Sequence, residues 1–139
     1  IVQAGNCSYL EMDHLVRNNI FEFGVFDFCD SVGLDTMLTS IRNYTRGYPH
    51  KDYYSGFITT LSELVSSGRL GIKSQEGFFK YPIDVTPVEE PLNTSEIVEH
   101  LLQTWLSASK RFTALVHLPI DDANHAIREY FNIEKGPFE

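Results

Sequence analysis

The chain has 139 residues, 42% of them hydrophobic, and a formal net charge of −8. This length suits one folded domain, and the acidic balance argues against a surface that follows a nucleic-acid backbone, which needs clustered basic side chains. Two Cys residues exclude a disulfide framework, and no apolar run approaches the ~20 residues of a membrane span. We therefore expect a cytoplasmic protein with free thiols that binds neither nucleic acid nor membranes.

Helices are predicted through the first half of the chain. Ser8 suits the cap of the first one, because Glu11 follows three residues later in the capping-box position. Gly68 stands where a helix commonly ends in a left-handed cap. Apolar residues at helical spacing predict three further helices before Gly68, around residues 23–29, 34–44 and 57–65.

A glycine-rich segment follows at residues 70–81. It is too rich in glycine for a helix, and we expect it to form one small β-hairpin around Gly71 and Gly77. A phosphate-binding loop is the alternative interpretation. No glycine directly precedes Lys73, however, and the segment follows a helix rather than a strand, so this alternative is disfavoured.

The last third of the chain is predicted to be a linker followed by helices. Residues 82–93 are rich in proline and read as the linker. The longest helix is expected over residues 95–117, and Pro119 is expected to end it. Asp121 or Asp122 is expected to cap one more helix. The fold class is therefore mainly α with one small β-hairpin.

No catalytic group can be assembled from the sequence. The five His residues are scattered and lack the spacing of a zinc site. Neither Cys7 nor Cys29 has a positioned basic neighbour that would activate a thiol. We therefore expect no metal, no cofactor and no catalytic residue in this chain.

Several short stretches together carry a family signature. They read Leu10-Glu-Met-Asp13, Phe23-Gly-Val-Phe-Asp27, Asp30-Ser-Val-Gly-Leu-Asp-Thr36, Gly68-Arg-Leu-Gly-Ile-Lys73 and Gly77-Phe-Phe-Lys-Tyr81. In content and order they resemble the C-terminal domain of the 3-hydroxyacyl-CoA dehydrogenase family. The set is more specific than any one of its pieces.

A second, partial copy of the signature is visible near the C-terminal end. It consists of Ile120-Asp-Asp-Ala-Asn124 and Asn132-Ile-Glu-Lys-Gly-Pro-Phe-Glu139, which resemble the opening helix and the glycine motif of the same domain. We therefore expect a first helical repeat at residues 1–81, the proline-rich linker at 82–93 and part of a second repeat at 94–139.

The resemblance implies a fold similar to the helical C-terminal domain of 6-phosphogluconate dehydrogenase, a homodimer, and a role in closing the cleft over an acyl-CoA. It implies that the residues at the cleft are Gly24, Val25, Phe26, Asp27 and Lys73. It gives a structural role to Gly68, Gly71, Gly77, Phe78 and Tyr81. In this family NAD and a catalytic His–Glu pair belong to an N-terminal nucleotide-binding domain, so we expect this chain alone to be inactive.

Two departures from the family pattern bear on function. Val25 stands where the family has proline, and Ile72, Gln75 and Glu76 replace residues that are often basic or glycine. The lower positive charge weakens any contact of this segment with CoA phosphates. An alternative function is therefore a stand-alone helical interaction module that keeps the fold without catalysis.

Overall fold

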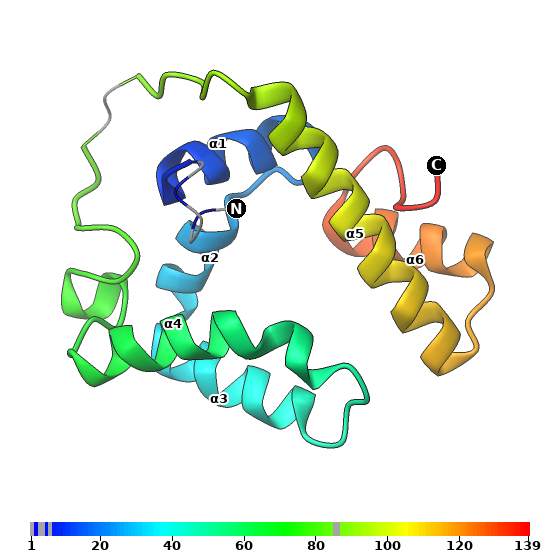
Figure 1. The fold of residues 1–139 in the computed structure, drawn as a ribbon, viewed down its shortest axis with the longest axis horizontal. Coiled ribbons are helices and arrows are strands. Elements are labelled where there is room, and N and C mark those ends of the chain that lie inside the picture. The colour runs from blue at the N-terminus through cyan, green and yellow to red at the C-terminus, as the bar shows by residue number, and fades with distance from the viewer. Residues whose placement is uncertain (1, 3–4, 6, 85–86) are drawn as a thin grey trace. The chain divides into compact units, whose positions relative to one another are not determined.

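The computed structural model describes residue 2, residue 5 and residues 7–84 and 87–139. Within these residues the chain forms six α-helices and two short 3-10 helices (Figure 1). The α-helices are α1 (Tyr9–Asn19), α2 (Val25–Val32), α3 (Leu34–Thr45), α4 (Ser55–Ser66), α5 (Thr94–Val116) and α6 (Ile120–Phe131). The 3-10 helices are η1 (Lys51–Tyr54) and η2 (Ile72–Ser74). The prediction of a mainly helical chain is confirmed.

The chain divides into two compact units. One consists of Ile1–Gly24 together with Val88–Glu139 and holds α1, α5 and α6, and the other is Val25–Pro87. We call them the discontinuous unit and the central unit. The expected division into repeats at 1–81 and 94–139 with a linker at 82–93 stays a prediction, and residues 85–86 of that linker lie outside the described residues.

The central unit is built on the helix pair α3 and α4, which lie side by side (Figure 1). Leu34 and Leu61 are fully buried, and Leu38 is 7% exposed. The ring of Phe78 packs between Phe26, at a centroid distance of 4.8 Å, and Phe57, at 6.3 Å. The segment after α4 is thus fixed to α2 and α4 by aromatic packing.

The discontinuous unit packs α1 against α5. Its apolar core contains Met12, Leu15, Val16 and Ile97, each at most 5% exposed. An aromatic cluster extends this core, in which the ring of Phe21 contacts the rings of Phe23, Trp105 and Phe131. Helix α1, which lies in the predicted first repeat, therefore shares a core with α5 and α6, which lie in the predicted second repeat.

Helix α1 begins as predicted. The Ser8 backbone N–H donates to Oε2 of Glu11 at 2.6 Å, and the Glu11 N–H donates to Oγ of Ser8 at 3.2 Å, which completes the capping box. Gly68, at φ +78°, follows α4 in the left-handed conformation that the sequence predicts.

The start of α6 differs from the prediction. Its N-cap residue is Pro119, while Asp121 and Asp122 lie in the first turn. Proline has no N–H to satisfy at that position, and its fixed φ suits the entry to a helix. The two carboxylates still favour this helix end through the helix dipole, although neither of them is the cap.

No β-hairpin forms at 70–81 among the described residues. Two isolated antiparallel bridges, Gly71 with Glu76 and Glu76 with Lys80, flank the 3-10 turn of η2. Oγ of Ser74 accepts the Leu70 N–H at 2.8 Å and donates to the Glu76 carbonyl at 2.8 Å. A side chain therefore takes the place of a ladder of backbone pairs, and the hairpin prediction is not confirmed.

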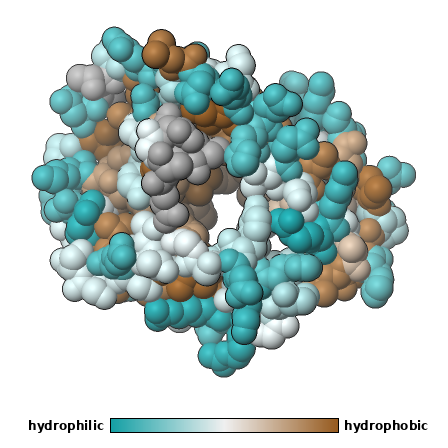
Figure 2. Space-filling view, in the orientation of Figure 1, coloured by the Kyte–Doolittle hydropathy of each residue, from teal (hydrophilic) through white to brown (hydrophobic). Residues whose placement is uncertain are grey.

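On the face shown in Figure 2, hydrophilic residues alternate with smaller hydrophobic patches. Of the helices in the described part of the chain, none combines the length and the apolar character needed to cross a membrane.

Candidate functional site

The signature residues of the central unit surround the carboxylate of Asp30. This side chain points from α2 into the core and is 1% exposed. Oδ1 accepts the backbone N–H of Phe78 at 2.9 Å, and Oδ2 accepts the N–H of Phe79 at 3.0 Å and the hydroxyl of Tyr81 at 2.8 Å. A buried carboxylate requires such donors, because an unpaired charge in the core is very costly. We call this set the Asp30 clamp.

Two of the signature glycines are required by the Asp30 clamp. A Cβ atom on Gly77 would lie 2.0 Å from Oδ1 of Asp30, and one on Gly71 would lie 2.3 Å from the Asp30 carbonyl oxygen. Neither approach is sterically possible, so only glycine lets the chain reach the carboxylate this closely. Arg69 reinforces the segment, since its Nη2 donates to the Gly77 carbonyl at 2.5 Å.

Lys73 is held by an ion pair. Its Nζ lies 2.5 Å from Oδ1 of Asp35 in the first turn of α3, and both side chains are nearly half exposed. The hydrogen bond from Lys73, together with the Thr36 N–H, lowers the pKa of Asp35. The Lys73 ammonium is therefore partly neutralised before any anionic ligand approaches it.

The structure separates the predicted cleft residues into two places. Val25, Phe26 and Asp27 form the first turn of α2, where Phe26 packs on Phe78. Lys73 lies near Gly33, just beyond the other end of α2. A helix of this length spans about 12 Å, so only an elongated ligand could contact both places, and the grouping of these five residues into one cleft stays a prediction.

Gly24, the remaining predicted cleft residue, packs against a different carboxylate. A Cβ atom on Gly24 would lie 2.4 Å from Cγ of Asp13, whose side chain is 1% exposed on α1. The same arrangement recurs at the C-terminal end. There a Cβ atom on Gly136 would lie 2.3 Å from Oδ1 of Asn124, which also accepts the Phe138 N–H at 3.1 Å. Both proposed copies of the signature therefore pair a buried polar side chain with a later glycine.

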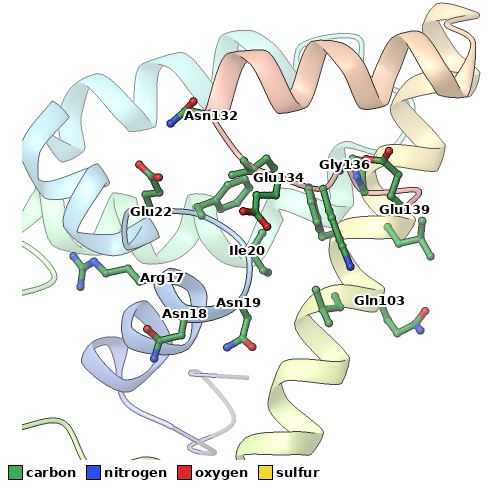
Figure 3. A pocket seen from close by; sticks show the side chains of 17 residues that line it. Arg17, Asn18, Asn19, Ile20, Glu22, Gln103, Asn132, Glu134, Gly136 and Glu139 are labelled. Atoms are coloured by element: carbon green, nitrogen blue, oxygen red, sulfur yellow. Dashed lines mark hydrogen bonds between the residues drawn. The ribbon is translucent and has the colours of Figure 1, made fainter.

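A groove in the discontinuous unit contains none of the predicted site residues. It has a volume of about 730 Å³ and lies among the end of α1, the middle of α5 and the C-terminal segment (Figure 3). Trp105, Phe21 and Ile20 supply apolar walls, while Asn19 and Gln103 supply amides. Sequence reasoning missed it because three distant segments meet there. The single Trp beside amide-rich segments was the available signal.

Comparison with known families supports the reading of these motifs. A family model described as the 3-hydroxyacyl-CoA dehydrogenase C-terminal domain matches residues 1–81. The chain belongs to this family. The matched residues of this 3-hydroxyacyl-CoA dehydrogenase domain include the Asp30 clamp and the Asp13–Gly24 pair, whereas α5 and α6 lie outside the match. Searches of curated proteins and of solved structures gave no match.

The described residues of this dehydrogenase-family chain show no group of three or more His, Cys, Asp or Glu side chains able to hold a metal ion. The His14 ring lies 3.9 Å from a Glu90 carboxylate oxygen, and both side chains are at least 36% exposed. Nε2 of His14 also lies 3.0 Å from Nδ2 of Asn18. These contacts form a surface cluster on α1.

Proposed function

We propose that this chain is the C-terminal substrate-cleft and dimerisation part of a cytoplasmic, NAD-dependent 3-hydroxyacyl-CoA dehydrogenase of fatty-acid β-oxidation. The whole enzyme would oxidise a 3-hydroxyacyl-CoA to the 3-oxoacyl-CoA. The observation that carries the proposal is the family match, which covers the complete Asp30 clamp. Substrate and NAD would meet only in the full-length parent.

The Asp30 clamp supports a positioning role. It fixes the middle of α2 to the segment that follows α4, so the first turn of α2 is presented by a rigid element. In that turn Val25 is 36% exposed. A rigid apolar wall suits an acyl chain, since positioning contributes to catalysis when the bound geometry is held close to the reactive one.

The proposal includes inactivity of the isolated chain. Oxidation of a secondary alcohol requires a base for the hydroxyl proton and a nicotinamide for the hydride. The contact of His14 with Glu90 joins a His ring to a carboxylate, but both side chains are exposed, and Glu90 lines the groove between α1 and α5 whereas His14 does not. We assign no catalytic role to it.

The experiment is a two-part test. Purified chain is incubated with NAD and 3-hydroxyacyl-CoA substrates of several lengths while NADH is followed, and no turnover is expected. In parallel, the coding sequence upstream of Ile1 is read. A nucleotide-binding domain ending in a catalytic His supports the proposal, whereas turnover by the pure chain contradicts the assignment of the chemistry to another domain.

A second candidate function is a stand-alone helical interaction module. The observation that favours it is that the buried Asp30 carboxylate finds its hydrogen-bond donors, the N–H groups of Phe78 and Phe79, within the chain itself. A start codon within a few residues of Ile1 would select this second function over the first.

A further inference from the structure

A second cavity extends the groove of the discontinuous unit. It has a volume of about 520 Å³ and also lies between α1 and α5. The two cavities share Asn18, Asn19, Leu102 and Gln103 as wall residues. They therefore lie next to each other along α5, and we call the two together the α1–α5 trough.

The trough is longer than a small metabolite needs. Its walls follow α5 from Thr94 to Leu106, and at 1.5 Å per residue this path is about 18 Å long. About five residues of extended polypeptide cover the same distance. The apolar residues along the path, Val98, Leu102, Trp105 and Leu106, offer contact to side chains that alternate along such a segment.

Side-chain amides line the trough between these apolar residues. Asn18, Asn19, Gln103 and Asn132 all belong to its walls, and Figure 3 shows them around the opening. Nδ2 of Asn19 donates to the Leu15 carbonyl at 2.8 Å, which fixes the direction of this amide. An amide both donates and accepts hydrogen bonds, as a peptide backbone also does, so this lining suits a bound polypeptide.

The charges on the walls are mainly negative. Glu90 and Glu99 lie on the walls of the smaller cavity, and Glu22 and Glu134 on those of the larger one, against the basic side chains of Arg17 and Lys135. A fifth carboxylate, that of Glu139, is already used, because it binds Arg128 at 2.6 Å and the Gly136 N–H at 2.7 Å. The smaller cavity therefore has two exposed carboxylates and no Lys or Arg on its walls, whereas Arg17 and Lys135 accompany the two exposed carboxylates of the larger one.

We propose that the α1–α5 trough binds a polypeptide segment in which Lys or Arg residues flank a short apolar run. The apolar side chains would lie on Leu102 and Trp105, and the flanking cations would face the carboxylates at the two ends. The partner is a different protein, and the site requires neither NAD nor acyl-CoA. It is thus independent of the proposed dehydrogenase function.

The test uses Trp105 as the probe, because it is the only Trp of the chain and lines the trough. The peptide Lys-Leu-Phe-Leu-Lys-Lys is titrated into the full 139-residue chain while tryptophan emission is recorded. A saturable change in emission is expected. The peptide Glu-Leu-Phe-Leu-Glu-Glu should bind about tenfold more weakly, and salt near ~1 M should weaken binding of the basic peptide.

Variants distinguish binding in the trough from nonspecific attraction of a basic peptide to an acidic protein. The double variant Glu90→Gln/Glu134→Gln should weaken the basic peptide about fivefold or more, since it removes one carboxylate from each half. The matched control is Glu96→Gln/Glu129→Gln, which removes two exposed carboxylates from α5 and α6 that line neither cavity. Circular dichroism verifies that both variants are folded.

Four outcomes overturn the proposal, and the first three concern the peptide titrations. They are the absence of a saturable emission change, equal affinity for the acidic peptide, and equal loss of binding in the control variant. A fourth is emission of Trp105 that changes with protein concentration alone, because a second copy of the chain then occupies the trough. The presence or absence of a nucleotide-binding domain upstream of Ile1 does not change any of these outcomes. The trough proposal and the dehydrogenase proposal can therefore fail separately.

Discussion

Gly77 and Gly68 are glycines for different physical reasons. Gly68 adopts φ +78° after α4, and a Cβ atom there would meet nothing within 4 Å. Gly77 has no positive φ, but its missing Cβ makes room for the Asp30 carboxylate. The first is replaceable at the cost of a left-handed conformation, whereas the second cannot be replaced without moving α2.

Gly77→Ala and Gly68→Ala test this difference. The substitution at Gly77 should lower the free energy of unfolding by about 3 kcal/mol or more, because it overpacks a buried site. The substitution at Gly68 should cost about 1 kcal/mol, the usual penalty for a left-handed residue with a Cβ. Urea denaturation followed by circular dichroism measures both, and equal losses would contradict the steric role of Gly77.

Asp30→Ala should destabilise the central unit by about 2–5 kcal/mol. It leaves the N–H groups of Phe78 and Phe79 buried without their acceptor, and each such group costs about 1–3 kcal/mol. Asp30→Asn should cost less, since its Oδ1 still accepts the Phe78 N–H. The control Asp35→Ala removes an exposed carboxylate from the next helix and should cost least. If the Ala and Asn variants of Asp30 unfold alike, the hydrogen bonds are not the stabilising element.

The sequence revealed the glycines but not their partner. Glycine at positions 71 and 77 is visible as a turn signal, while Asp30 lies more than 40 residues earlier. One signal was present, because Asp30 follows Phe26 by four residues and so lies on the same helical face as this apolar residue. A charged residue on the apolar face of a helix implies a buried partner, but local spacing does not say which one.

At the scale of elements, the prediction was correct where the deciding side-chain contacts are local in sequence. The start of α1 was predictable because Ser8 and Glu11 interact within one turn. The hairpin prediction failed because the local glycine pattern does not reveal that Ser74 binds two backbone groups. The start of α6 was misplaced by two or three residues, since Pro119 and the two Asp residues all favour a helix start.

A tyrosine cluster joins the end of α3 to η1. The ring of Tyr54 contacts Tyr44 at a centroid distance of 5.9 Å, Tyr48 at 6.1 Å and Tyr53 at 5.5 Å. Burial raises the pKa of Tyr54 to about 12, with further contributions from Tyr44 and its other neighbours. The neutral phenol is thus favoured in the folded protein.

This raised pKa predicts a loss of stability at alkaline pH. Between pH 10 and about 12 the unfolded chain releases the Tyr54 proton while the folded chain keeps it. The folded state then binds more protons, so the free energy of unfolding falls as pH rises through this window and is unaffected below it. Tyr54→Phe should flatten that part of the pH profile.

Urea midpoints measured across the window check the Tyr54 prediction. The control Tyr130→Phe removes a side chain that is 83% exposed on α6 and should leave the slope as it is. A profile in which both variants retain the wild-type slope would show that Tyr54 titrates normally.

At the scale of the whole molecule, the proposed homodimer needs an apolar surface. Phe112, Leu115 and Val116 share one face of α5 by their helical spacing and are each at least 43% exposed. Exposed apolar stripes of this kind commonly mark interfaces. We expect self-association of the isolated chain through this face.

Analytical ultracentrifugation at high micromolar concentration tests the self-association. The wild-type chain should sediment with twice its mass of 15.9 kDa or be in exchange with that form. Leu115→Glu should shift it to the monomer, because a charge would be buried in the contact. Leu92→Glu places the same charge on a fully exposed residue outside the stripe and should not. A strictly monomeric wild type contradicts the dimer role.

The sequence predicted the family and most helices but not the α1–α5 trough. Family motifs lie within short stretches of the chain, so they can be recognised from the sequence alone. The match to residues 1–81 confirmed the family. The trough is formed by α1, α5 and the C-terminal segment, whose proximity depends on tertiary packing. Lys73 illustrates the same limit, because its ion pair with Asp35 joins residues 38 positions apart.

The Asp30 clamp also bears on how such a signature persists in evolution. Asp30, Gly71 and Gly77 constrain one another within a single chain, because a Cβ atom on either glycine would overlap with Asp30. Selection for a folded protein is therefore sufficient to retain them, even in a lineage that has lost its catalytic partner. The motif therefore indicates which family the domain descends from, and it does not by itself indicate a present activity.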